Sequence, residues 1–352
     1  MTDKKNAFDL LRLLLALCVL ITHGILLGGY KLHDPLSYPS KGQTDLAEFG
    51  VMGFFTLSGY LITASFDRAK NIWIFLSHRL LRIFPGFWVC LIITAFIIAP
   101  LIFTLSGRPL ATFSFTGPES AIGFVYHNFL LKINQWSIKD LLNFEAYKDS
   151  LNGSLWSLFP EMQCYCFTLL TGSLGLFNRN KFLYLIFSIT VFVFFAINFN
   201  FSKSFGPTIL ILSPALKLYA SYMAGALLFI FRDQLSLDKK GTIFLLLFTL
   251  MLIKFGGYNL LSPLLIAMVL INTFQLFEFK IRYDVSYGLY IYSFPVQQLL
   301  FQLVGNKLPV IVFIGLALLI SAILGLLSYI LVERPFINLR KKTDKALLGL
   351  TQ

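Results

Sequence analysis

Residues 8–29 read FDLLRLLLALCVLITHGILLGG, a stretch that is largely apolar but carries the ionisable side chains of Asp9, Arg12 and His23. A helix needs about 20 predominantly apolar residues to cross the hydrocarbon core of a bilayer, and this stretch is long enough. Two lysines precede it, as in a signal peptide, but it is long and has no small-x-small cleavage site. We therefore expect a retained first transmembrane span.

Long apolar runs recur along the whole chain. Of its 352 residues, 57% are hydrophobic and 13% are charged, and the mean hydropathy is +0.75, whereas soluble domains contain about 45–50% apolar residues. Barrel strands would alternate in polarity over about ten residues, a pattern that these runs lack. The sequence predicts an all-α fold, a polytopic transmembrane helical bundle of about ten spans, at 8–27, 49–66, 84–105, 151–177, 182–199, 208–231, 242–255, 258–277, 285–304 and 309–332.

The seventh and eighth predicted spans meet at Gly256 and Gly257, and the seventh is short. Either both cross the membrane or together they form a single re-entrant hairpin. Ten spans occupy nearly the whole length, so we expect any chemistry to take place inside the bundle rather than in an appended soluble domain.

The distribution of basic residues predicts the orientation. With an even number of spans, nineteen Lys and Arg residues fall on the side of the termini and nine on the other side. Positive charge marks cytoplasmic loops, so the net charge of +12 reports orientation rather than nucleic-acid binding. We expect both termini in the cytoplasm, one transmembrane domain over 1–340 with a folded exterior segment at 106–150, and a short cytoplasmic tail at 341–352.

Arg12 and His23 are the first candidate functional pair. They are eleven residues apart, which on a helix places them on one stripe with about 20° and roughly 16 Å between them. An anion held at Arg12 could extend a reactive end towards His23, a side chain suited to general-base work. The alternative is an arginine that extends to the headgroups and a histidine hydrogen-bonded between helices.

Arg79 and Arg82 form a second candidate site in the predicted loop 67–82, one helical turn apart just before the third span. Pro85 suits the first turn of that span. Guanidinium groups bind phosphate in a bidentate manner, so the pair suits a phosphorylated ligand. Ordinary positive-inside anchoring would also explain it.

Glu161 is a third candidate, about ten residues and roughly 15 Å into the predicted span 151–177. Such a buried acid could orient His23, line an acceptor site, hold a helix kinked at Pro160, or pair structurally with another helix. Ser58 and Gly59 indicate small-residue helix packing. The four cysteines lie in apolar runs and indicate neither disulfides nor a metal site.

These segments resemble the integral membrane acyltransferase family 3, which includes O-acetyltransferases of O-antigen and other exopolysaccharides. The similarity covers nearly the whole chain, as a series of individually weak motifs in the family's order. The matched positions are Arg12 and His23; Phe54, Phe55, Ser58, Gly59 and Tyr60; Arg79 and Arg82; Trp156, Ser157, Leu158, Glu161 and Tyr165; Ser286, Tyr287, Tyr290 and Pro295; and Glu333, Arg334 and Pro335.

Two departures from the family pattern remove polar groups. Met52 and Gly53 stand where many relatives have an Asp before the two phenylalanines, and Ser293 stands where many have a histidine. Asp45 and Glu48 are candidate replacements that could orient His23.

The resemblance implies a transmembrane O-acyltransferase of the bacterial inner membrane. Its donor would be acyl-CoA, most commonly acetyl-CoA, with the phosphates near Arg12, Arg79 and Arg82, and no metal would be needed. His23 would act as general base on a hydroxyl of a cell-surface or lipid-linked glycan, or would carry the acyl group transiently, with Glu161 as a second catalytic candidate. The rival interpretations are a transporter or channel that uses the same polar residues and a catalytically silent family member.

Overall fold

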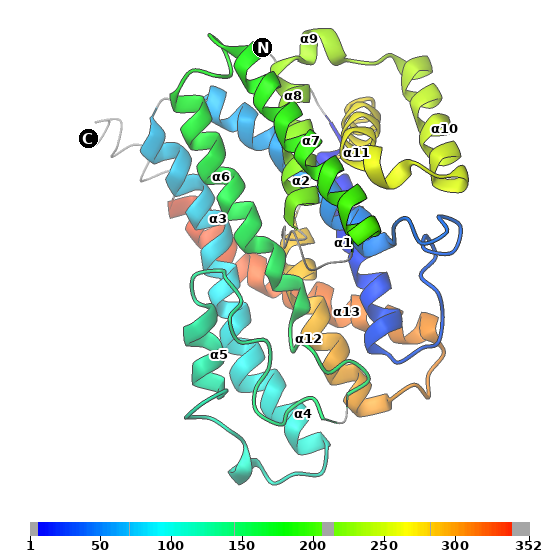
Figure 1. The fold of residues 1–352 in the computed structure, drawn as a ribbon. Coiled ribbons are helices and arrows are strands. Elements are labelled where there is room, and N and C mark those ends of the chain that lie inside the picture. The colour runs from blue at the N-terminus through cyan, green and yellow to red at the C-terminus, as the bar shows by residue number, and fades with distance from the viewer. Residues whose placement is uncertain (1–5, 70, 144, 206–214, 282, 340–352) are drawn as a thin grey trace, which may run out of the picture. The chain divides into compact units, whose positions relative to one another are not determined.

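The computed structural model describes residues 6–339, apart from 70, 144, 206–214 and 282. All secondary-structure elements assigned within these residues are helices, which confirms the all-α prediction (Figure 1). Five helical stretches in the described part are long and apolar enough to cross a membrane: Phe8–Leu27, Leu46–Asp67, Ile72–Leu105, Tyr258–Gln275 and Val310–Leu339. Ten spans and cytoplasmic termini remain predictions, and the tail at 341–352 lies outside the described residues.

The chain divides into two compact units. The first unit comprises Met1–Leu15, Pro35–Phe75 and Pro160–Ile281, and the second comprises the remaining three segments. The first unit takes in the start of α1 (Phe8–Leu27), α2 (Leu46–Asp67), most of α6 (Leu158–Ser173), α7 (Lys181–Phe205), α8 (Ala215–Ile230), α9 (Arg232–Leu235), α10 (Lys239–Phe255) and α11 (Tyr258–Gln275). The second takes in the rest of α1, most of α3 (Ile72–Ile93), η1 (Thr94–Ile98), α4 (Ala99–Leu105), η2 (Leu110–Thr112), α5 (Ala121–Asn128), η3 (Gly153–Ser157), α12 (Ser286–Val304), α13 (Val310–Ser328) and η4 (Tyr329–Glu333).

In the first unit, α2 packs directly against α8. A Cβ atom built on Gly59 would lie 1.9 Å from the carbonyl oxygen of Tyr222, and one built on Gly225 would lie 2.0 Å from that of Thr56. The two helix backbones are therefore in contact, which the small residues permit. In lipid there is no hydrophobic driving force between helices, and such close packing stabilises their association instead. The predicted small-residue packing at Gly59 is confirmed.

Replacing Gly59 by alanine should destabilise the first unit by about 1–3 kcal/mol, because α2 and α8 must separate to admit the methyl group. Thermal unfolding of the protein in nanodiscs would measure the loss. Gly315→Ala is the matched control, since a Cβ there has no neighbour within 4 Å. Equal melting temperatures for Gly59→Ala and this control would contradict the close-packing argument.

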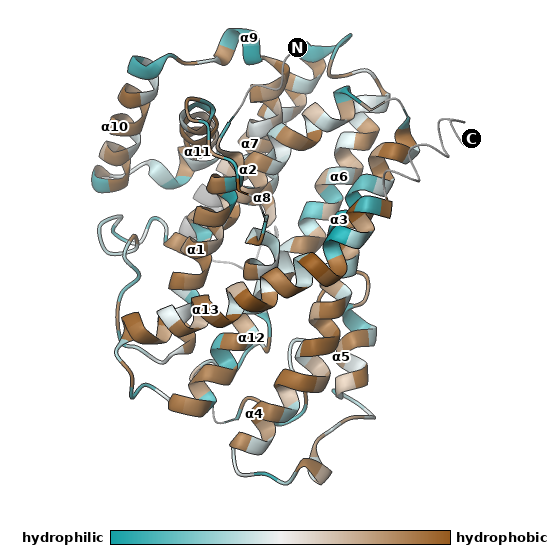
Figure 2. Cartoon of the chain, turned by 180° about the vertical axis from the view of Figure 1, so that it is seen from behind, coloured by the Kyte–Doolittle hydropathy of each residue, from teal (hydrophilic) through white to brown (hydrophobic). Residues whose placement is uncertain are grey.

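In the second unit, α12 is tied to its neighbours by two fully buried glutamines. Gln297 Nε2 donates to the carbonyl oxygen of Leu20 on α1 at 2.9 Å. Gln298 Nε2 donates to the carbonyl oxygens of Tyr147 and Ser150 at 3.1 and 2.9 Å. Figure 2 shows hydrophobic residues along much of α4, α12 and α13, so these polar ties are set within apolar helices.

Two predicted boundaries are wrong. Helix α3 begins at Ile72 rather than at residue 84, so Arg79 and Arg82 lie inside a helix and Pro85 lies within it. The apolar side chains just after residue 71 extend the helix, and a proline is tolerated in a membrane helix whose neighbours satisfy the freed backbone. Helix α6 begins only at Leu158, after the 3-10 turn η3, which puts Glu161 in its first turn rather than ten residues deep. Pro160 favours this late start because the first turn needs no backbone N–H from it.

The predicted seventh and eighth spans, 242–255 and 258–277, correspond to two helices, α10 and α11, which pack against each other. Gly256 and Gly257 join them with φ values of +120° and +92°, a conformation that glycine adopts without a steric penalty. Gln43 closes the junction, accepting a hydrogen bond from Tyr258 N at 3.0 Å and donating to the carbonyl oxygen of Ile253 at 2.8 Å. Two separate helices are therefore present, and whether both cross the membrane stays a prediction.

Within segment 106–150, the described residues fold around buried polar side chains. Asn128 Nδ2 donates to the carbonyl oxygen of Gln135, and its Oδ1 accepts from the backbone N–H groups of Asn134 and Gln135. Trp88 Nε1 on α3 donates to the carbonyl oxygen of Phe129 at 3.0 Å. These bonds hold the segment to the helices of the second unit.

Glu145, which is 3% exposed in this segment, should make stability depend on pH. Burial raises its pKa to about 7 from an ordinary 4.5. The protonated form is thus favoured by folding, so this stabilisation is complete below about pH 4.5 and is lost as the pH rises through about 7, an effect of roughly 3 kcal/mol. The melting temperature of the wild type should fall between about pH 5 and about pH 8, and Glu145→Gln should remove most of that fall. Asp149→Asn, at an exposed carboxylate, is the control; an unchanged pH profile in Glu145→Gln would refute the assignment.

Candidate active site

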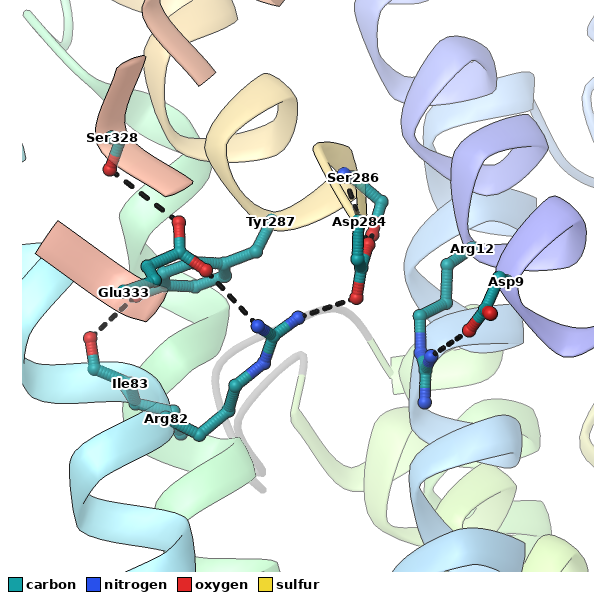
Figure 3. A network of polar contacts seen from close by, with 9 residues as sticks. All are labelled: Asp9, Arg12, Arg82, Ile83, Asp284, Ser286, Tyr287, Ser328 and Glu333. Atoms are coloured by element: carbon teal, nitrogen blue, oxygen red, sulfur yellow. Dashed lines mark hydrogen bonds and ion pairs between the residues drawn. The ribbon is translucent and has the colours of Figure 1, made fainter. Parts of the chain in front are cut away.

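Helix α1 carries both Arg12 and His23 on one continuous helix, as predicted. Arg12 belongs to the first unit, where its Nη1 lies 2.8 Å from Asp9 Oδ1, one helical turn earlier (Figure 3). Both side chains are about one-third exposed, at 29% and 35%. The Arg12 charge is thus partly balanced by a local carboxylate and remains accessible to an anion.

His23 belongs to the second unit and packs edge-to-face against Phe294 of α12, with ring centroids 4.9 Å apart. Its Nδ1 is buried and has no hydrogen-bond partner among the described residues. The helix-to-helix hydrogen bond required by the alternative interpretation of His23 is therefore not formed within this part of the chain. The ring is fixed by packing, and its nitrogens are not committed to a described protein group.

Phe294 is held in turn by the segment that leads into η3. A Cβ built on Gly153 would lie 2.7 Å from the Phe294 ring, and the Tyr147 ring centroid is 6.0 Å from it. Ser157 Oγ and Tyr290 Oη lie 2.7 Å apart in a buried hydrogen bond. Two of the predicted motif segments, around Trp156 and around Tyr290, thus meet beside the aromatic ring that positions His23.

Arg82 lies at the centre of an ion-pair network in the second unit (Figure 3). Its Nη2 is 2.7 Å from Asp284 Oδ2, and its Nη1 is 3.1 Å from Glu333 Oε2. Its guanidinium lies 5.8 Å from the centroid of the Tyr287 ring, and Tyr287 Oη donates to the carbonyl oxygen of Ile83 at 2.8 Å. Glu333 ends the π-helical turn η4 and is 1% exposed.

This network changes the interpretation of the two arginines. Arg82 is thus engaged by the side chains of two acidic residues, which makes it less available to bind a phosphate. Arg79 and Arg82 nevertheless line the same pocket of about 230 Å³, with His78, Leu81 and Ile337. The structure therefore brings the predicted pair together at one pocket.

Sequence analysis missed Asp284 and gave Glu333 no role. Asp284 Oδ1 accepts hydrogen bonds from Ser286 N at 3.2 Å and from Ser286 Oγ at 2.5 Å, at the start of α12. An Asp side chain that accepts from the backbone N–H two residues later forms an Asx turn, but nothing local links either acid to residue 82. Only the contact between distant segments reveals these partners.

Glu161 lies in the first unit, in the first turn of α6. Its Oε1 accepts hydrogen bonds from Tyr165 Oη at 2.5 Å and from Ser58 Oγ of α2 at 3.3 Å. These two hydroxyls fix the orientation of the Glu161 carboxyl group. Ser58 therefore serves as a hydrogen-bond donor, in addition to the small-residue packing expected at this point.

Asp45 and Glu48, suggested as replacements for a missing family Asp, have other partners. Asp45 caps α2 by accepting from Glu48 N at 2.7 Å. Glu48 Oε1 is 2.6 Å from Lys217 Nζ of α8, which also donates to Asn259 Oδ1 at 2.6 Å. Both side chains act in the first unit as structural groups. Within the described part of the chain, no cluster of three or more His, Cys, Asp or Glu could hold a metal ion.

Comparison with known proteins gives a consistent result. The acyltransferase domain of acyltransferase family 3 matches residues 5–330. The chain is 28% identical over 348 residues to an O-acetyl transferase of Shigella phage Sf6, covering 95% of this chain and 97% of that protein. It is 38% identical over 85 residues to nodulation protein 10 of Rhizobium leguminosarum bv. viciae, covering 24% of this chain and 23% of that protein. No solved structure matches the chain.

Proposed function

Since the chain belongs to the acyltransferase family 3 and is an acyltransferase, we propose that it transfers an acyl group, acetyl in the first instance, from acyl-CoA to a hydroxyl of a glycan. The similarity to a phage O-acetyl transferase over nearly the full length of both proteins supports an oxygen atom as the acceptor. The apolar helices support a site within a membrane, which we take to be the bacterial inner membrane.

The observation that carries this proposal is the environment of His23. His23 lies in an apolar helix, packs on Phe294 and has a buried nitrogen that forms no hydrogen bond with a described residue. Placing such a group in a membrane helix costs free energy, which by default indicates a function. A general base must have a nitrogen able to accept the proton of the attacking hydroxyl. His23 is held in place by packing against Phe294, and no described residue forms a hydrogen bond with its buried Nδ1.

In the proposed reaction, His23 takes the proton of the acceptor hydroxyl while the hydroxyl oxygen attacks the thioester carbonyl carbon. A C–O bond forms, the C–S bond breaks, and the CoA thiolate leaves. The protonated imidazole then returns its proton to the thiolate sulfur, so the products are an O-acyl glycan and free CoA. Glu161 acts in this scheme as a positioning or acceptor-binding acid held by Tyr165 and Ser58.

For the donor, we assign the phosphates of CoA to Arg79 in the second unit, and we keep Arg12 in the first unit as a separate candidate for binding an anion. Arg79 lines the pocket beside Arg82, and the Arg12 guanidinium is partly exposed. We assign Arg82 a different role, in which its guanidinium pairs with Asp284 and Glu333 and holds the wall of the Arg79 pocket. The sequence-based prediction places the phosphates near Arg12, Arg79 and Arg82; we propose that Arg82 instead acts as a positioning residue.

The test is a pair of assays on purified protein in nanodiscs with radiolabelled acetyl-CoA and mixed surface glycans. Release of CoA thiol together with a labelled, base-labile ester on the glycan is the expected result. If the protein moves solutes across vesicle membranes without forming an ester, the result favours a transporter. If it cleaves none of several acyl-CoA thioesters, the result favours a catalytically silent partner protein. Either of these results would overturn the proposal.

Replacing Arg79 by alanine should raise the KM for acetyl-CoA about 10- to 100-fold with a smaller effect on kcat, because hydrogen bonds to a charged group contribute about 1.5–3 kcal/mol. Isothermal titration with CoA would measure the loss of affinity directly. Lys132→Ala, an exposed lysine in segment 106–150, is the matched charge control. Unchanged CoA affinity in Arg79→Ala would count against its phosphate role.

A further inference from the structure

A second, larger pocket lies in segment 106–150, away from the Arg79 pocket in the sequence. It has a volume of about 630 Å³, within the range of about 300–1,000 Å³ typical of ligand sites. Its walls come from residues 118–119, 127, 134–143 and 148. All of them belong to the second unit, and the sequence places this segment on the exterior side.

The lining combines one broad aromatic surface with hydrogen-bonding groups of both kinds. Trp136 is 42% exposed and shares the pocket with Glu119, Asn134, Asp140 and Lys148. Carboxylates accept from hydroxyls, ammonium groups donate to them, and amides do both. The lining contains two lysines, Lys139 and Lys148, and two acidic residues, Glu119 and Asp140. Their charges balance, so the pocket has no net charge that would select a polyanion.

The pocket is built rather than incidental. Glu119 and Asp140 have φ values of +52° and +57°, a left-handed conformation that costs energy in residues other than glycine and is concentrated at functional sites. Lys139 N donates to the carbonyl oxygen of Glu119 at 2.8 Å, which joins the two strained positions. Within the described residues, the carboxylate of Glu119 makes no hydrogen bond.

The walls are held by groups outside the lining. Arg108 donates to the carbonyl oxygens of Asp140 and Leu141 at 2.6 and 3.2 Å, and its guanidinium lies 3.9 Å from the centroid of the Phe103 ring on α4. On the opposite wall, Leu151 N donates to the carbonyl oxygen of Trp136 at 2.8 Å, two residues before η3. The pocket is thus tied both to α4 and to the segment that packs against Phe294.

From these features we propose that this pocket binds the saccharide part of the acceptor, with a pyranose ring on the Trp136 indole. A sugar ring offers a C–H face for an aromatic surface and an edge of hydroxyls for the surrounding polar groups, which is the combination that the lining supplies. The inference rests on the proposed acyltransferase function. It adds that acceptor recognition occurs in segment 106–150, separately from the donor pocket lined by Arg79.

The test compares Trp136→Ala, Trp136→Phe and Glu119→Gln with the wild type in nanodiscs, using Tyr126→Ala as the control. Tyr126 is a 77% exposed aromatic of the same segment that does not line the pocket. We expect Trp136→Ala to raise the acceptor KM about tenfold, with an unchanged affinity for CoA, and Trp136→Phe to recover most of the loss. Acceptor KM values equal to those of the wild type in both Trp136→Ala and Glu119→Gln would overturn the proposal.

A binding experiment makes the result independent of turnover. Saturation-transfer NMR would use a mixture of bacterial oligosaccharides, supplied once free and once attached to a polyprenyl diphosphate carrier. Signals from sugar protons that appear with the wild type and Tyr126→Ala but are lost in Trp136→Ala support the pocket, and the arm that gives them identifies the source. If the wild type gives no sugar signal in either arm, the saccharide-binding proposal is overturned even if ester is formed. If sugar signals appear but no ester is formed, the saccharide-binding proposal stands and the transferase mechanism is overturned.

Discussion

Replacing His23 by glutamine is expected to lower the kcat of acyl transfer by about 10²- to 10⁴-fold, the usual contribution of a general base. Glutamine keeps a polar side chain of similar reach against the Phe294 ring, whose centroid lies 4.9 Å from that of His23. It cannot take up the proton of the acceptor hydroxyl. The affinity for CoA and the melting temperature should therefore stay close to those of the wild type.

His33→Gln provides the matched control, because this exposed histidine follows α1 in the chain and has no assigned role in the reaction. Steady-state assays of CoA release and ester formation on both variants would measure the effect. A kcat within about threefold of the wild type in a well-folded His23→Gln protein would exclude both the general-base role and an acyl-histidine intermediate.

Replacing Arg82 by methionine should destabilise the second unit by about 1–3 kcal/mol, because the acidic side chains lose a hydrogen-bond donor while Arg82 itself is 27% exposed. Glu333 is 1% exposed and would lose the cation that lies 3.1 Å from its Oε2. Part of the cost should return in the double variant Arg82→Met/Glu333→Gln, because the amide removes the unpaired buried charge. Thermal unfolding of the two single variants, the double variant and the wild type forms a double-mutant cycle.

The same cycle separates the structural role of Arg82 from donor binding. As a positioning residue, Arg82 should affect CoA affinity mainly through the fold, so the double variant should recover affinity together with stability. If Arg82 is a direct phosphate ligand, the double variant should recover stability while its affinity for CoA stays as low as that of Arg82→Met. That outcome would return Arg82 to the role that the sequence alone predicts.

The sequence predicts well what local hydrophobicity controls. The first span, predicted at 8–27, coincides with α1, and the predicted boundary at Gly256 and Gly257 separates α10 from α11. It fails where a helix extends beyond its apolar run, as α3 does through the arginine-containing turns before Pro85. It fails again at η3, where an apolar run begins in a 3-10 turn rather than in an α-helix.

The candidate site divides in the same way. Arg12, His23, Arg79, Arg82 and Glu161 could be selected from the sequence because ionisable groups in apolar surroundings are costly. The partners of Arg82 could not, since residues 82, 284 and 333 are brought together only by the packing of α3, α12 and η4. The pocket around Trp136 was also missed, because its walls depend on left-handed backbone at Glu119 and Asp140, which the residue types do not indicate.

The buried glutamines of α12 have a consequence for movement during turnover. Gln297 fixes α12 to the backbone of α1 at Leu20, and Gln298 fixes it to the backbone at Tyr147 and Ser150. Breaking such bonds in an apolar surrounding would leave unsatisfied polar groups, at a cost of about 1–3 kcal/mol each. These three segments should therefore move as one rigid body, and substrate entry and product release must use displacements at other helix contacts.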